Sequence, residues 1–160
     1  MSSYYLPIRA LHMIAGSSWL GAVILINFVL IPVLPKLKES IRREVFIHLF
    51  PALFRLASVL SVTLVITGVI LIQYQTDGAW DLWNRGRWGT SIFWGGLLGV
   101  LLTFFHFFIE SYLGKKIKKK AANNTESFTD IHLKIKIIPR IGLLVILLAF
   151  LFMIRASHGL

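Results

Sequence analysis

Four long apolar stretches alternate with short polar segments along the chain. They run from about residue 7 to 34, 46 to 74, 90 to 113 and 137 to 156. Each is long enough to cross the hydrocarbon layer of a bilayer, which is about 30 Å thick and takes about 20 helical residues. The pattern predicts an all-α integral membrane protein, an up-down four-helix bundle. The first stretch lacks a preceding basic segment and a small-residue cleavage site, so we expect a permanent anchor.

The composition agrees with lipid as the solvent. Of the 160 residues, 56% are hydrophobic and 15% are charged. The length predicts a single transmembrane domain over residues 1–160. A net charge of +10 could indicate nucleic acid as a partner, but the positive residues gather in short loops, which fits anionic headgroups better. The chain has no cysteine, which excludes disulfides, iron–sulfur clusters and covalently attached c-type haem.

The basic residues of the loops predict the orientation. The first loop carries Lys36, Lys38, Arg42 and Arg43, and the third carries Lys115, Lys116, Lys118, Lys119, Lys120, Lys134 and Lys136. In the middle loop, Arg85 and Arg87 are offset by Asp77 and Asp81. The positive-inside rule therefore predicts cytoplasmic first and third loops and both termini outside, in a multi-pass protein of the cell membrane.

A helix start is predicted inside the third loop. Asn123 and Glu126 have the spacing of a cap and its partner three residues later. We therefore expect the fourth helix to begin in the cytoplasm and to bend at Pro139 before it enters the membrane.

Ionisable residues inside the spans are functional candidates because their burial in lipid is costly. A rise of about 1.5 Å per residue sorts them into two depths. The outer set is His12, His158, Arg9 and Arg155, and the inner set is His48, His106, Arg55 and Arg140. Two histidines at one depth on facing helices can ligate a haem, with arginines near its propionates. We expect one or two b-type haems, ligated by His12 with His158 and by His48 with His106.

Helix three carries a stripe of small and polar residues that includes one of these histidines. Gly95, Gly99, Thr103, His106 and Glu110 recur at spacings of three and four. Such a face lets a flat ring approach closely, so Gly95 and Gly99 are candidate cofactor contacts. The alternative is that the glycines only pack helices. Glu110 could likewise form a structural ion pair with Arg55 on helix two.

The first span resembles the opening helix of a group of small haem-binding membrane proteins. The run Leu11-His12-Met13-Ile14-Ala15-Gly16-Ser17-Ser18-Trp19-Leu20-Gly21 is similar to that of the HemJ-type protoporphyrinogen oxidases and of the copper-resistance D family. The likeness continues through Arg43-Glu44, Pro51, Thr67-Gly68, Trp88, His106 and Pro139. The resemblance implies a four-helix bundle that binds b-type haem, with His12 and His106 as the matched positions. The lysine expected early in helix three of the HemJ type is missing.

Three functions remain open on these grounds. The favoured hypothesis is a cytochrome b-like protein that transfers electrons across the membrane, alone or as a respiratory subunit. The alternatives are a HemJ-like porphyrinogen oxidase and a copper transport or resistance protein. A hydrolase is not expected, because no motif of that class is present. The partners predicted beside the lipid are a redox protein or a quinone, and a further copy of the chain.

Overall fold

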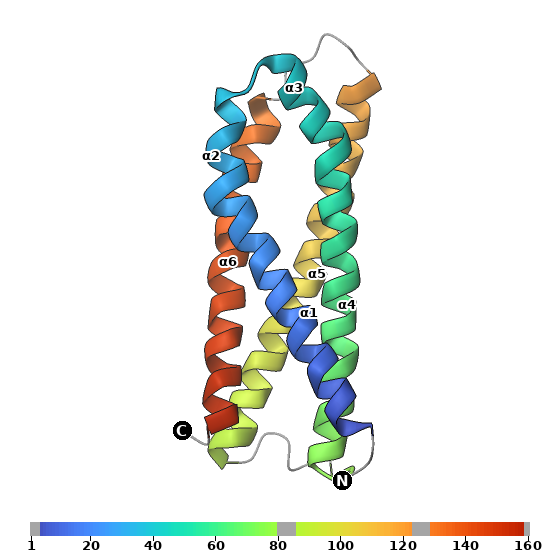
Figure 1. Ribbon diagram of the computed structural model, residues 1–160, viewed down its shortest axis with the longest axis vertical. Coiled ribbons are helices and arrows are strands. Elements are labelled where there is room, and N and C mark those ends of the chain that lie inside the picture. The colour runs from blue at the N-terminus through green and yellow to red at the C-terminus, as the bar shows by residue number, and fades with distance from the viewer. Residues whose placement is uncertain (1–3, 80–85, 123–128, 159–160) are drawn as a thin grey trace.

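The computed structural model describes residues 4–79, 86–122 and 129–158, and helices account for nearly all of these residues (Figure 1). In chain order they are α1 (Tyr5–Leu25), η1 (Ile26–Leu30), α2 (Ile31–Val33), η2 (Leu34–Lys36), α3 (Glu39–Glu44), η3 (Val45–Leu49), α4 (Phe50–Gln75), α5 (Gly86–Ala122) and α6 (Thr129–His158). The predicted all-α class is confirmed.

Four continuous helical segments are long and apolar enough to cross a membrane. They are Tyr5–Lys36, Glu39–Gln75, Gly86–Lys120 and Lys136–Ser157. Their side chains mostly face outward, including large apolar ones such as Phe28, Phe104 and Leu144. Such a surface is unfavourable in water and favourable in lipid. This is the architecture of a multi-pass membrane protein.

Two helices extend beyond the apolar stretches that predicted them. α5 continues through the lysine-rich segment to Ala122, because lysine is a good helix former and its head can reach water. α6 begins at Thr129, ten residues before Pro139, which lies inside the helix. The start before Pro139 agrees with the prediction. The predicted cap at Asn123 and Glu126 lies outside the described residues.

The first two spans each contain one widened, π-helical turn. These turns are η1 and η3, and each is followed two residues later by a proline, Pro32 or Pro51. A proline in a helix clashes with the carbonyl four residues earlier and cannot donate to it. Those carbonyls belong to Phe28 and Ile47, which lie inside the two π turns. The widened turns therefore accommodate the proline rings without ending the helix.

Contacts between side chains pair the start of one long helix with the end of another. The Tyr5 and Tyr74 rings lie 6.4 Å apart, edge to face, which places the start of α1 beside the end of α4. A Cβ on Gly95 would lie 2.8 Å from Cε of Met153, so the start of α5 touches the end of α6. Figure 1 shows α4 and α6 at the two sides, with α1 and α5 crossing between them in this view.

The buried apolar side chains form two clusters. One lies where the first and third loops begin and consists of Ile31, Leu34, Phe46, Phe50, Ile109, Leu113 and Ile117. The other lies near the middle of the bundle and consists of Trp19, Leu102 and Ile146. The first cluster joins residues on both sides of the first loop to the last turns of α5. The residues beside the first loop and the lysine-rich part of α5 therefore lie at one end of the bundle.

Candidate functional site

His12 is held by a hydrogen bond between α1 and α4. Its ring is half-buried, and its Nδ1 lies 2.9 Å from the hydroxyl oxygen of Thr67. That hydroxyl donates its proton to the backbone carbonyl of Thr63, at 2.6 Å. With the threonine proton on the Thr63 carbonyl, Thr67 is left as the acceptor from His12, and this assignment puts the ring proton on Nδ1. The lone pair remains on Nε2, the form in which an imidazole binds a metal.

Gly68, the next residue, leaves room for the same ring. A Cβ at this position would lie 3.2 Å from Cε1 of His12, closer than ordinary van der Waals contact. Thr67 and Gly68 thus act together, one fixing the protonated nitrogen and the other allowing the close approach. Sequence reasoning singled out this dipeptide only through the family resemblance and did not connect it with His12.

His106 belongs to a polar cluster between α4 and α5. Its Nε2 lies 3.1 Å from the hydroxyl oxygen of Ser58 and 3.3 Å from the carbonyl oxygen of Phe54. Ser58 donates its own proton to Oε2 of Glu110, at 2.6 Å. Ser58 and Phe54 therefore both act as acceptors toward Nε2, and this network requires a proton there.

Aromatic rings enclose His106 on several sides. The ring centroid of Trp19 on α1 lies 6.4 Å from that of His106, and the centroids of Phe54 and Phe107 lie at 6.2 and 5.7 Å. These rings cover part of the cluster, in which the His106 and Glu110 side chains are 13% and 29% exposed. The surroundings are those of a buried hydrogen-bonded network within a span, and such networks mark functional positions.

The predicted ion pair between Arg55 and Glu110 is wrong. Glu110 accepts the Ser58 hydroxyl proton and lies 3.8 Å from Nε2 of His106, whereas Arg55 is exposed. Each successive helical residue turns the side-chain direction by about 100°. The residue spacing between two helices therefore does not show whether a side chain on one faces a side chain on the other. Burying the arginine would also cost more than leaving its head at the surface.

His48 faces away from the interior. Three quarters of its side chain is exposed, at 76%, and its Nε2 lies 3.2 Å from Oε2 of Glu44, one turn earlier. The structure therefore places His48 and His106 in separate hydrogen-bonded groups. Their predicted pairing around a haem stays a prediction, and it requires both rings to leave these partners.

The remaining predicted site residues lie in three kinds of surroundings. The arginines proposed for the propionates are all exposed, namely Arg9, Arg55, Arg140 and Arg155. His158 is the last residue of α6, and its side chain lies outside the described part of the chain. Gly95 faces Met153, Phe152 and Ala149 on α6, whereas a Cβ on Gly99 would meet nothing within 4 Å. Gly95 thus packs helices, and Gly99 borders open space.

Asn27 is a buried polar residue that sequence reasoning did not single out. It lies in η1, and its Nδ2 donates to the carbonyl oxygens of Val23 and Pro139, at 2.8 and 2.9 Å. Its Oδ1 is buried without a partner. The bond to Pro139 fastens the end of the first span to the start of the fourth. The sequence signal for this residue was an isolated asparagine within an apolar stretch.

Ligand geometry sets limits on the chemistry. Among the described residues, no three or more His, Asp and Glu side chains gather in a group that could hold a metal ion. A haem is less demanding, because its porphyrin supplies the equatorial ligands and the protein adds axial ones. The His12 geometry fits one such ligand.

No protein-family model, curated protein or solved structure matches this chain.

Proposed function

We propose that this chain is a b-type haem-binding membrane protein that takes part in electron transfer across the membrane. The observation that carries the proposal is the state of His12. Its Nδ1–H is committed to Thr67, so its Nε2 lone pair is available to iron. Metal-bound histidines characteristically donate the second ring N–H to such a partner, which orients the ring and raises its basicity.

His158 would be the second residue that holds the haem, and a contact between α1 and α6 supports it. A Cβ on Gly16 would lie 3.6 Å from Cζ of Phe150, so these faces of α1 and α6 meet. His12 lies about 6 Å and His158 about 12 Å from this contact, in the same direction along the bundle. When bound, the haem supplies an iron that takes up and releases one electron. The chain supplies the ligands and excludes water.

Absorption spectroscopy of the purified protein tests the proposal. The protein, produced with haem available and kept in detergent, should show a Soret band and bands typical of b-type haem after reduction. His12→Ala should lose the absorbance of the haem that His12 holds, which is nearly all of it with one haem bound and about half with two. Leu11→Ala is the matched control, because it shortens an exposed side chain next to His12 on the same helix. Circular dichroism checks that both variants remain helical.

Two results would reject the proposal. One is a colourless protein that binds no added haem. The other is an unchanged spectrum in His12→Ala, which would remove His12 from the ligands. A porphyrinogen oxidase would be recognised by turnover of a porphyrinogen, and a copper protein by copper that co-purifies and is lost with His12.

We further infer that the basic end of the bundle faces the cytoplasm of a cell membrane, with both termini outside. The support is that Leu34, beside the first basic loop, packs with Leu113 and Ile117, beside the third. Two basic loops at one end satisfy the positive-inside rule together. Electrons would then cross between the outer His12 level and a partner, either a redox protein, a quinone or a second copy of the chain.

A second candidate function is proton transfer within the membrane, favoured by the cluster of Ser58, His106 and Glu110. Chains of histidine and carboxylate in spans mark proton paths. The Ser58 hydroxyl lies within hydrogen-bond distance of both His106 and Glu110, so it can pass a proton between them. This role fits electron exchange with a quinone, since reduction of a quinone takes up protons.

Proteoliposomes carrying an internal pH dye test this second role. With a soluble quinone and a reductant supplied, we expect redox-driven proton uptake that Glu110→Gln abolishes without changing the haem spectrum. Glu44→Gln is the control, since Glu44 contacts the exposed His48. Equal proton uptake in Glu110→Gln and the unaltered protein would contradict the role.

A further inference from the structure

Two adjoining surface grooves lie at the basic end of the bundle. One holds about 450 Å³ along the last turns of α5, lined by Phe108, Ser111, Tyr112, Lys115, Lys116 and Lys119. The other holds about 400 Å³ between α5 and the start of α6, lined by Phe108, Ile109, Tyr112, Ile137 and Ile138. Phe108 and Tyr112 line both, so the two hollows adjoin at these side chains, and we refer to the pair as one groove with a basic end and an apolar end.

The groove crosses the boundary between hydrocarbon and headgroups. Eleven helical residues separate Phe108 from Lys119, which is about 16 Å along the axis. The apolar stretch of α5 ends near Leu113, so Phe108 lies at hydrocarbon depth and the lysines lie just beyond it. Tyr112 stands at the boundary, where tyrosine is enriched in membrane proteins.

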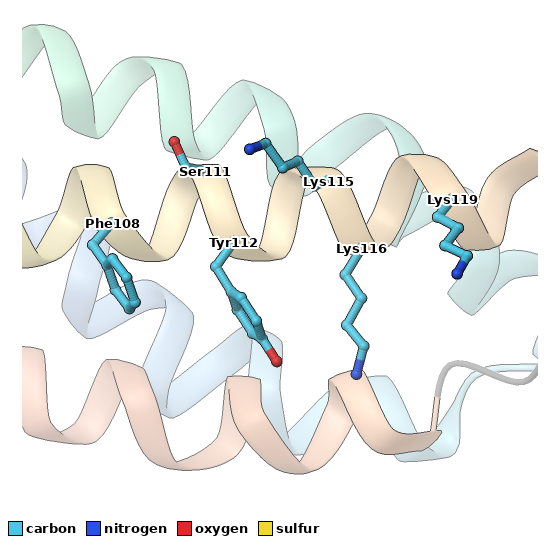
Figure 2. Close-up of a pocket in the computed structure, with 6 residues that line it drawn as sticks. All are labelled: Phe108, Ser111, Tyr112, Lys115, Lys116 and Lys119. Carbon is cyan, nitrogen blue, oxygen red and sulfur yellow. The ribbon is translucent and has the colours of Figure 1, made fainter.

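The side chains divide the groove by chemistry. Figure 2 shows Phe108, Tyr112 and Lys116 extending from the same side of α5, with Ser111 and Lys115 on the other side in this view. Among the described residues, no Asp or Glu lines either groove. The lysine end therefore attracts an anion, and the hydroxyl group of Ser111 offers a further hydrogen bond. The other end offers only apolar wall beside Ile137 and Ile138.

We propose that this groove binds an anionic phospholipid from the surrounding membrane. The phosphate lies among Lys115, Lys116 and Lys119, and an acyl chain follows Phe108, Ile137 and Ile138. Basic pockets between transmembrane helices are suited to such headgroups. A soluble phosphate would use only the lysine end, whereas a phospholipid uses both ends and is already present at this depth. The proposal does not depend on haem binding.

Native mass spectrometry of the full chain, released from nanodiscs, tests the site. The nanodiscs contain equal amounts of phosphatidylglycerol and phosphatidylcholine with the same acyl chains. We expect one phosphatidylglycerol to be retained in preference to phosphatidylcholine. Replacing Lys115, Lys116 and Lys119 together by Gln should weaken this retention by about a hundredfold, since each lysine near an anionic surface contributes about fivefold.

A matched charge control separates the site from general attraction to the membrane surface. Lys36, Lys38 and Lys118 replaced by Gln remove the same charge from the same end, but these residues line neither groove. The control variant should retain phosphatidylglycerol. Equal loss in both triple variants, no loss in either, or equal retention of both lipids would overturn the proposal. Displacement of the lipid by millimolar inorganic phosphate would also overturn it, because the apolar end would then contribute nothing.

Discussion

Nδ1 of His12 lies 2.9 Å from the hydroxyl oxygen of Thr67, 55 residues later in the chain. The bond joins α1 to α4, and the Thr63 carbonyl completes it by accepting the threonine proton. In this arrangement the threonine favours the tautomer of His12 that carries its proton on Nδ1. In a membrane interior, where few other partners exist, this choice determines whether Nε2 can act as a ligand.

The first prediction concerns that threonine. Thr67→Val keeps the shape of the side chain but removes the acceptor, so the His12 ring loses its fixed tautomer and orientation. Loss of such a supporting partner typically weakens metal binding about 10- to 100-fold. Titration of haem into the haem-free protein should show a decrease of this size. Thr67→Ser, which retains the hydroxyl, should bind haem nearly as the unaltered protein does. Equal affinity in the Val and Ser variants would contradict the role of Thr67.

The second prediction concerns the number of haems. If both depths are occupied, the haem-to-protein ratio should be about two, as expected for two bis-histidine levels in one bundle. His12→Ala and His106→Ala should then each lower the ratio to about one. For a haem to bind at the inner level, Nε2 of His106 must break its contacts with Ser58 and Phe54. Otherwise the iron must bind Nδ1 of His106. A ratio unchanged in His106→Ala, measured by pyridine haemochrome and protein assay, would remove the inner haem.

The third prediction separates helix packing from cofactor contact on α5. Gly95→Val places a branched side chain against Met153, Phe152 and the backbone of Ala149, so α5 and α6 must move apart. Overpacking of this kind costs about 1–3 kcal/mol, which should appear as a lower melting temperature in detergent. Gly99→Val is the matched control, because its Cβ meets nothing within 4 Å. If Gly99→Val instead loses haem while the protein remains stable, Gly99 contacts the cofactor in the open space beside it.

The fourth prediction is topological. Reporter fusions after Leu37 and after Lys120 should read as cytoplasmic, and a fusion near Gly78 should read as external, because the basic loops resist translocation. An alkaline phosphatase reporter, active outside, and a fluorescent protein, bright inside, give opposite signals at each position. Cytoplasmic signal at Gly78 would invert the assigned depths, so His12 would lie near the inner face.

The four spans could be predicted from the sequence because membrane insertion depends on local properties. About 20 consecutive apolar residues satisfy the bilayer wherever they occur, and their backbone must then be helical to satisfy its own hydrogen bonds. The depth of each ionisable residue follows from the constant rise of the helix. Those two rules selected His12, His48, His106 and His158; the structure places His12 and His106 as half-buried and His48 as exposed, and the side chain of His158 lies outside the described residues.

The partners of these histidines were decided only by the tertiary structure. Each helical residue rotates by about 100°, so a side chain's direction depends on how the helix packs against its neighbours. His48 and His106 have comparable depths, yet one contacts Glu44 at the surface and the other contacts Ser58 inside. The π turns before Pro32 and Pro51 also change the rotation of everything that follows. Sequence spacing therefore determined how deep these groups lie, and helix packing determined which groups they meet.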